Sequence, residues 1–290
     1  MAKLTISIVN FNAGEYLLNC LKSIKDVEDE VNMEVFVVDN NSSDRSIEKA
    51  QKEFPKYKYI LNIENLGFGK AHNLVLKNLN TEYILILNPD VELKKGDLKE
   101  MLNYMEENKE VGASSPEIIL TNGVRDLTAH RGFPTPWASF KYFLFKDDSL
   151  YHLTNFDLTK IHEVDAITGA YFLTRKSVLE KVGFFDEDYF MYAEDLDLCY
   201  RIKKAGYKIM YVPTVKVLHH KGITTGLKKH SQHVTTATLE TRKKMTGYFY
   251  STMKIFYKKH LEKDYPFFIN WLVYIGINLK WWLAKRSLSV

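Results

Sequence analysis

The chain has 290 residues, of which 46% are hydrophobic and 26% are charged. This ordinary composition excludes a fibrous or largely disordered chain, and the length suits one large domain with an appendage or two modest domains. The net charge of +4 is distributed unevenly along the chain. Residues 240–290 carry ten Lys or Arg and three acids, a net charge of +7, so the remaining residues have a net charge of −3. A near-neutral body with a basic tail indicates an acidic surface or a membrane as the partner of the tail.

Short apolar runs alternate with helical patterns over the first ninety residues. Strands are expected at residues 4–9, 34–38, 57–61 and 83–87, and helices at 15–25, from about 43, and at 69–79. This alternation predicts βαβ units, and therefore an α/β fold with a mostly parallel sheet flanked by helices.

The pattern loosens after Leu93. Residues 97–107 predict a surface helix, whereas 122–160, with Pro134 and Pro136, predict an irregular lid or binding loop. Order returns with a strand at 167–173, a helix at 175–182, a helix over 190–201 and a strand at 208–212 that should stop at Pro213.

The strand at 83–87 runs directly into Asn88, Pro89 and Asp90. Because proline cannot continue the ladder, the strand should deliver Asp90 to the carboxyl end of a central strand, where open α/β sheets bind ligands. Such a carboxylate suits a hard divalent cation that carries phosphates, and the alternative is an ordinary turn aspartate. Asn10 and Asp39 should end neighbouring strands at the same edge, as a nucleotide pocket requires.

A second acidic group opens the helix over 190–201. Glu194, Asp195 and Asp197 either favour the helix dipole or place a carboxylate in a partly buried mouth, where it can act as a general base. His219 follows an apolar run and is either a structural residue or a metal ligand. Spacing alone does not connect His219 with Asp90.

Taken in order, several short motifs between residues 4 and 225 resemble those of family 2 glycosyltransferases, in particular the bacterial rhamnosyltransferases. The matching segments are 8–12, 37–44, 65–73, 87–90, 169–170, 183–187, 192–197, and His219 with Gly222. The chain departs from the family pattern at Phe184, where a second glycine is usual, and at Thr224, where a serine is usual. The resemblance implies the GT-A fold, a Rossmann-like nucleotide-sugar-binding domain over residues 1–225.

The resemblance also implies roles for individual residues. Asp195 would be the catalytic base, with Glu194 orienting the acceptor or supporting the base. Asp90 would be the last residue of the metal-binding motif, whose first acid is replaced here by Asn88. Mg²⁺ or Mn²⁺ would therefore be held largely by diphosphate and water. His219, later in the chain, would be a further ligand of the metal or the diphosphate. The donor-binding residues would be Asn10, Phe11, Asp39, Asn65, Lys70, Asn88 and Asp90.

The implied reaction is inverting transfer of a sugar, with dTDP-L-rhamnose as the first choice of donor. The acceptor would be a hydroxyl of a lipid-linked or polysaccharide molecule in cell-surface glycan synthesis. A UDP-hexose or UDP-N-acetylhexosamine donor is the main alternative. A nucleotidyltransferase should have a Gly-rich phosphate loop near the first strand, where residues 10–16 offer only Gly14. A non-catalytic binding module would not need Glu194 and Asp195 together with Asp90.

Residues 226–290 are expected to form a helical appendage. Its apolar stretch 267–283 is shorter than the ~20 residues of a bilayer span and contains Asn270, Asn278 and Lys280. Tryptophans at 271, 281 and 282 suit the headgroup region, so docking on the inner face of the plasma membrane is expected, with a homodimer interface as the alternative. The tail has no recognisable nucleic-acid-binding module, so no nucleic-acid partner is expected.

Cys20 and Cys199 lie in no CxxC spacing and are expected to be buried free thiols in a reducing compartment. The N-terminal residues show no basic-then-apolar signal segment, which favours a cytoplasmic location.

Overall fold

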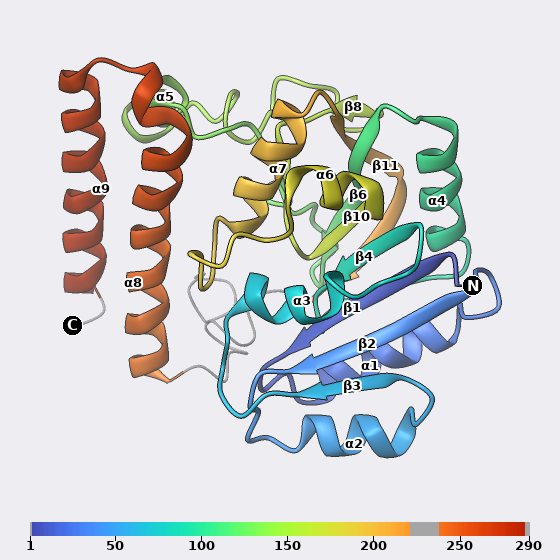
Figure 1. The fold of residues 1–290 in the computed structure, drawn as a ribbon. Helices are drawn as coiled ribbons and strands as arrows, with labels where there is room; N and C mark the ends of the chain where they lie inside the picture. The colour runs from blue at the N-terminus through green and yellow to red at the C-terminus, as the bar shows by residue number, and fades with distance from the viewer. Residues whose placement is uncertain (1, 221–237, 288–290) are drawn as a thin grey trace.

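The computed structural model describes residues 2–220 and 238–287. Gly222 and Thr224, named above, lie outside the described residues. The first four strands pair in parallel in the order β3-β2-β1-β4. They span Leu4–Asn10 (β1), Met33–Asp39 (β2), Lys58–Leu61 (β3) and Tyr83–Leu87 (β4). The predicted α/β fold with a mostly parallel sheet flanked by helices is confirmed (Figure 1).

The second half of the sheet is mixed. β10 lies antiparallel between β4 and β6, β11 runs parallel to β6, and β5 and β8 pair antiparallel with β11. β7 and β9 form a separate two-stranded sheet. These strands span Val91–Glu92 (β5), Val111–Leu120 (β6), His130–Arg131 (β7), His162–Glu163 (β8), Ala166–Ile167 (β9), Tyr171–Arg175 (β10) and Lys208–His219 (β11).

Helices cover both faces of the sheet, which explains the unbroken apolar sequence of β4. Tyr83, Leu85 and Leu87 belong to a core cluster with α1, α2 and α4, whereas Ile84 and Ile86 belong to a second cluster with α3, α6 and α7. The helices span Glu15–Lys25 (α1), Ser46–Glu53 (α2), Phe68–Leu76 (α3), Asp97–Glu107 (α4), Pro136–Phe145 (α5), Lys176–Val182 (α6) and Glu194–Lys204 (α7).

The C-terminal part forms a helical hairpin beside the sheet (Figure 1). It consists of α8 (Leu239–Phe256), the π-helical turn η2 (Tyr257–Leu261), the short 3₁₀ turn η3 (Glu262–Asp264) and α9 (Phe267–Ser287). Phe256, Tyr257 and Leu261 are buried in the second core cluster, so the hairpin packs on the sheet domain through η2. Among the helices of the described ranges, none combines the length and the apolarity that crossing a bilayer requires.

Three expectations for chain segments were wrong. The strand predicted at 208–212 does not stop at Pro213; β11 continues to His219 through a register shift between Val212 and Lys216, and a bulge of this kind accommodates proline's missing N–H. The strand predicted at 167–173 is two strands in two sheets, β9 and β10, separated by residues 168–170. The segment 122–160 is not wholly irregular, because Thr135 caps α5 by accepting a hydrogen bond from the Ala138 N–H at 3.2 Å.

Other local expectations hold in part. Cys20 and Cys199 are buried free thiols, as predicted. The helix expected from about residue 43 begins at Ser46, whose N–H donates to Asp44 Oδ1 at 3.0 Å.

Gly67 brings the start of α3 against the loop that precedes α7. The Phe68 N–H donates to the Phe190 carbonyl at 2.9 Å, and a Cβ on Gly67 would lie 2.2 Å from that carbonyl oxygen. Gly67 also has φ +82°, which L-residues rarely adopt. The site described below therefore depends on a glycine at this position.

We expect Gly67→Ala to lower the free energy of unfolding more than Gly183→Ala does. Gly183 has a similar φ of +85°, yet its added Cβ would meet only Arg201 Nη1, at 3.5 Å. Both variants carry the backbone cost of about 1–3 kcal/mol, and Gly67→Ala adds a clash worth about 1–3 kcal/mol. Urea denaturation of both variants measures the difference, and equal losses would refute the close approach at Gly67.

Candidate active site

The ends of β1 and β2 form a buried polar cluster. The Asn10 side chain donates to Asp39 Oδ1 at 2.7 Å and to the hydroxyls of Ser42 and Ser46 at 3.0 and 2.8 Å. Asp39 Oδ2 accepts a hydrogen bond from the Ser42 N–H at 2.9 Å. Because Asn10 is fully buried and its amide is bonded to these neighbours, it orients Asp39.

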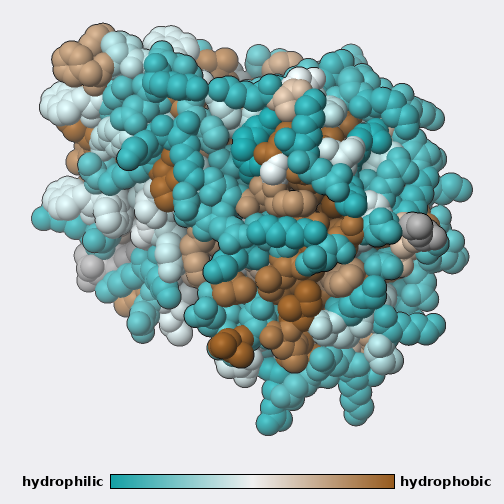
Figure 2. Space-filling view, viewed as in Figure 1, coloured by the Kyte–Doolittle hydropathy of each residue, from teal (hydrophilic) through white to brown (hydrophobic). Residues whose placement is uncertain are grey.

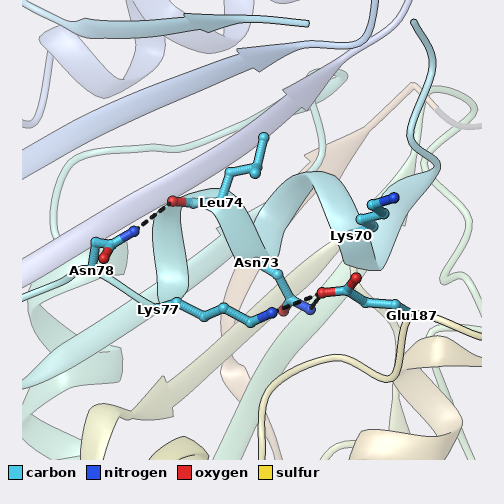
Figure 3. Close-up of a pocket in the computed structure, with 6 residues that line it drawn as sticks. All are labelled: Lys70, Asn73, Leu74, Lys77, Asn78 and Glu187. Carbon is cyan, nitrogen blue, oxygen red and sulfur yellow. Dashed lines mark hydrogen bonds and ion pairs between the residues drawn. The ribbon is translucent and has the colours of Figure 1, made fainter.

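The remaining predicted donor residues are not all placed together. Phe11, Asn65 and Asn88 are half-buried, and Asn65 Oδ1 accepts a hydrogen bond from the Gly67 N–H at 2.9 Å. Lys70 is exposed and lines an open depression along the outer side of α3, shown in Figure 3. The other lining residues are Asn73, Leu74, Lys77, Asn78 and Glu187, none of which was predicted to bind the donor.

Sheet pairing brings Asp90 and His219 together. The pairing of β5 with the end of β11 places Val91 opposite His219, and His219 Nε2 then lies 3.1 Å from Asp90 Oδ1. Burial alone would raise the pKa of Asp90, but the charge of His219 and its hydrogen bond outweigh burial and hold this pKa below its ordinary value. The sequence could not establish this proximity, which depends on strands more than a hundred residues apart.

The Asp90–His219 pair fits part of a shell for a divalent cation. A carboxylate and an imidazole are suitable ligands, and His219 Nδ1 is buried without a hydrogen-bond partner. Across residues 2–220 and 238–287, no group of three or more His, Cys, Asp or Glu could hold an ion. A cation here would therefore need oxygens from a ligand or from water to complete its shell.

Asp195 is held in the first turn of α7 by donors from two other segments. Its Oδ1 accepts from Arg131 Nη2 at 3.0 Å, and its Oδ2 accepts from the Gly169 N–H at 3.2 Å. Arg131 lies on β7, and the pairing of β7 with β9 carries it toward α7. Arg131 was not predicted as a site residue, because it falls in the segment expected to be irregular. An isolated arginine gives no signal in such a segment.

Glu194 has a different environment from its neighbour. Its side chain is buried, and Oε2 has no hydrogen-bond partner among the described residues. Burial, followed by the charge of Asp195, raises the pKa of Glu194 to about 8. Glu194 is thus mainly protonated at neutral pH and can donate a hydrogen bond.

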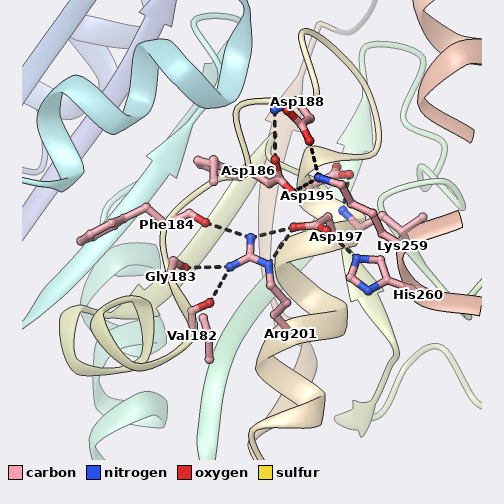
Figure 4. Close-up of polar contacts among 12 residues, drawn as sticks. Val182, Gly183, Phe184, Asp186, Asp188, Asp195, Asp197, Arg201, Lys259 and His260 are labelled. Atoms are coloured by element: carbon pink, nitrogen blue, oxygen red, sulfur yellow. Dashed lines mark hydrogen bonds and ion pairs between the residues drawn. The ribbon is translucent and has the colours of Figure 1, made fainter. Parts of the chain in front are cut away.

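Asp197, the third acid, is directed away from this pair. It forms ion pairs with Arg201 and His260 (Figure 4), so Arg201 has a structural role on this helix.

Residues 168–170, between β9 and β10, connect the two acidic groups. The Asn88 N–H donates to the Ala170 carbonyl at 3.0 Å, and the Gly169 N–H reaches Asp195. A Cβ on Gly169 would lie 2.7 Å from the Phe68 ring, so only glycine fits there without rearrangement. The loop that carries Asp90 and the helix that carries Asp195 therefore flank one short backbone segment.

We expect Glu194→Gln to become more stable relative to the wild type as pH rises from about 4.5 to about 8. In this window the unfolded wild type releases the Glu194 proton while the folded state retains it, so wild-type stability falls. The gain should be on the order of 5 kcal/mol and is measured by urea denaturation at several pH values.

Glu187→Gln is the control of opposite sign. Hydrogen bonds from Lys77 and Asn73 hold the pKa of Glu187 below its ordinary value, so this variant should lose stability relative to the wild type as pH rises through the carboxyl range. A pH-independent difference for Glu194→Gln would contradict the buried, protonated carboxyl.

Comparisons with known proteins identify the family of the chain. The profile of the family described as Glycosyl transferase family 2 matches residues 5–183. The N-acetylglucosaminyl-diphospho-decaprenol L-rhamnosyltransferase of Mycobacterium tuberculosis H37Rv is 27% identical, over 77% of this chain and 78% of that protein. Rhamnosyltransferase WbbL of Escherichia coli K12 is also 27% identical, over 74% and 82%.

Solved structures share the fold. GalNAc-T7, crystallised with UDP, GalNAc and Mn²⁺, gives a TM-score of 0.58 at 15% identity, covering 76% of this chain and 44% of that one. The mannosyltransferase PcManGT of Pyrobaculum calidifontis, in complex with GDP-Man and Mn²⁺, gives a TM-score of 0.54 at 18% identity. The match covers 87% of this chain and 64% of that one. The family profile covers more than half of the chain, and the GT-A fold is consistent with it: the chain belongs to glycosyl transferase family 2.

Proposed function

We propose that the protein is a metal-dependent inverting glycosyltransferase that transfers L-rhamnose from dTDP-L-rhamnose to a hydroxyl of a lipid-linked or polysaccharide acceptor in cell-surface glycan synthesis. The observation that carries the proposal is the segment 168–170, which lies between the Asp90 loop and Asp195. The relatives named rhamnosyltransferases support the sugar. A UDP-hexose donor remains the second candidate, because solved structures of the same fold contain UDP or UDP-GlcNAc.

The donor is proposed to bind along the ends of β1, β2 and β4. Asp39, oriented by Asn10, would accept hydrogen bonds from the base. Phe11, Asn65 and Asn88 would line the same edge. Lys70, exposed in the first turn of α3, is also proposed to contact the donor.

Asp90 and His219 would hold Mg²⁺ or Mn²⁺ together with the diphosphate. When bound, the ion neutralises charge on the leaving nucleoside diphosphate. The amide of Asn88 cannot supply a second protein carboxylate, so the diphosphate itself would complete the shell.

Asp195 is proposed to accept the proton of the acceptor hydroxyl while that oxygen attacks the anomeric carbon from the face opposite the diphosphate. The new carbon–oxygen bond forms as the bond to the diphosphate breaks, so the anomeric configuration inverts. Arg131 and the Gly169 N–H hold the carboxylate in place. Protonated Glu194 would donate a hydrogen bond that orients the acceptor.

Residues 226–290, which include the hairpin of α8 and α9, are proposed as an appendage to a catalytic domain over residues 1–225. Within this appendage, α9 is proposed to dock on the inner face of the plasma membrane. An exposed apolar row runs along α9, in which Phe267 and Trp271 are the most exposed side chains, at 83% and 63%. The other members are Phe268, Leu272, Ile275, Leu279, Trp282 and Leu283. Figure 2 shows pale and brown side chains among teal ones along this edge of the molecule.

α5 extends this surface. Its exposed residues are Trp137, Phe140, Phe143, Leu144 and Phe145. Lys280 of α9 lies over the ring of Phe143, 4.3 Å from its centroid, which joins the two helices. Lys285 and Arg286 stack on Trp281 and Trp282, so cations accompany the aromatic rings as they do at an anionic membrane interface.

We expect Asp195→Asn to abolish turnover while donor binding persists, because the amide keeps the size of the side chain but cannot accept the proton. Hydrolysis of dTDP-L-rhamnose, UDP-glucose and UDP-GlcNAc with Mn²⁺ should fall by at least about 100-fold. Thermal stabilisation by the active donor should stay close to the wild-type value.

The exposed Asp157→Asn is the matched control, and EDTA should remove wild-type turnover. Hydrolysis of, and thermal stabilisation by, dTDP-L-rhamnose alone would support the rhamnosyl assignment. The same results with UDP-sugars alone would replace dTDP-L-rhamnose with a UDP-sugar as the proposed donor. Turnover by Asp195→Asn near the wild-type rate would remove Asp195 from the role of base.

We expect Trp271→Glu to weaken cosedimentation with vesicles that contain phosphatidylglycerol, because it places a charge in the apolar row. Leu61→Glu is the matched control, since Leu61 is 57% exposed on β3, which Figure 1 places away from α9. Equal vesicle binding by both variants would contradict membrane docking. A concentration-dependent dimer without vesicles, disrupted by Trp271→Glu, would favour the homodimer.

A further inference from the structure

The C-terminal hairpin contacts α7, the helix that carries Asp195, where α8 passes into η2: Phe256 and His260 both pack against Tyr200. α8 passes at Tyr257 into η2, and π-helical turns of this kind are frequent at functional sites. The burial of Phe256, Tyr257 and Leu261 in the second core cluster fixes η2 against the body of the molecule. His260 lies on this turn and points toward α7 (Figure 4).

His260 contacts an acid two positions after Asp195. His260 Nε2 lies 2.5 Å from Asp197 Oδ1, and the Tyr200 hydroxyl donates to the His260 carbonyl at 3.2 Å. Asp197 is 1% exposed, and a buried carboxylate needs partners to remain ionised. Arg201 supplies the others, with Nε and Nη2 at 2.8 and 2.7 Å from Asp197 Oδ2.

Arg201 extends this network to the loop after α6. Its guanidinium donates to the carbonyl oxygens of Val182, Gly183 and Phe184 at 2.8, 2.9 and 2.8 Å. Burial would raise the pKa of Asp197, but the His260 hydrogen bond and the charge of Arg201 outweigh burial and lower it. A charged Asp197 therefore binds η2, α7 and this loop to one another.

The first turn of α7 needs such support. Tyr192 and Ala193, which precede Glu194, have φ of +72° and +65°, conformations that persist only where the surroundings impose them. The Asp197 N–H donates to the Ala193 carbonyl at 2.8 Å, so Asp197 is bonded directly to this strained backbone. A displacement of the Asp197 backbone would therefore also move Ala193, the residue adjacent to the two acids of the site.

We infer that His260 is a positioning residue: through Asp197 it holds the first turn of α7 in the orientation that presents Asp195 to the acceptor. The inference rests on the role proposed for Asp195. It makes the C-terminal hairpin a part of the catalytic unit in addition to a docking element, because the hairpin supplies a hydrogen bond on which the site depends.

Three variants of the full chain test this inference. Turnover is the hydrolysis of whichever nucleotide sugar the wild type cleaves with Mn²⁺, and hydrogen exchange of the amides at 194–198 reports the order of α7. His260→Ala should lower kcat by about 10–100-fold and leave the KM for the donor within about threefold of the wild-type value. It should also accelerate hydrogen exchange of the amides at 194–198. His260→Gln, whose amide N–H can reach Asp197 Oδ1, should restore most of the wild-type kcat and most of the slow exchange at 194–198. Lys258→Ala is the control, because Lys258 is exposed on the same turn.

Each contrary result overturns the inference. Wild-type kcat and exchange in His260→Ala would show that α7 does not need the contact. A loss that His260→Gln does not rescue would exclude the hydrogen bond as the cause. A loss of donor binding in proportion to kcat would indicate general unfolding. If Asp195→Asn retains turnover, the proposed base fails, but exchange at 194–198 still decides whether His260 orders α7.

Discussion

The backbone of residues 168–170 is the constraint on which the site depends. Because β10 enters the sheet antiparallel between β4 and β6, its first residue, Tyr171, stands opposite Leu87, just before the loop that carries Asp90. The Ala170 carbonyl then accepts a hydrogen bond from the Asn88 N–H, and the Gly169 N–H donates one to Asp195. One short segment thus sets the spacing between the nucleotide side and the acceptor side. The close packing of Gly169 on Phe68, and of Gly67 on Phe190, leaves this segment little freedom to shift.

Three acids within four positions have three different environments. Asp195 is bound by a cation and a backbone N–H, Glu194 is buried with its pKa raised, and Asp197 lies between Arg201 and His260 with its pKa lowered. Their sequence pattern is compatible with simple helix capping, and the surrounding segments create the difference. Desolvation raises the pKa of Glu194, whereas the His260 hydrogen bond and the charge of Arg201 lower the pKa of Asp197.

Local sequence was sufficient for the first half of the fold. The strands at 4–9, 34–38, 57–61 and 83–87 were correct to within a residue or two, because uninterrupted branched apolar runs and short connections leave few alternatives. Asp90 could be placed at a strand end by the same reasoning. The errors arose where tertiary pairing overrides local signals. Pro213 is accommodated by a bulge within β11, and at 168–170 the segment predicted as one strand passes from one sheet to another. Arg131 and His260 reach their acids only through distant pairing or packing, which the residues around them do not encode.

The central claim is a single displacement at the anomeric carbon with one proton-accepting carboxylate. NMR of the sugar released or transferred from an anomerically pure donor, recorded in the first turnovers before the anomers equilibrate, tests this claim most directly. A product with inverted anomeric configuration is the predicted result. Retention of configuration would contradict the single displacement and the role of Asp195 within it.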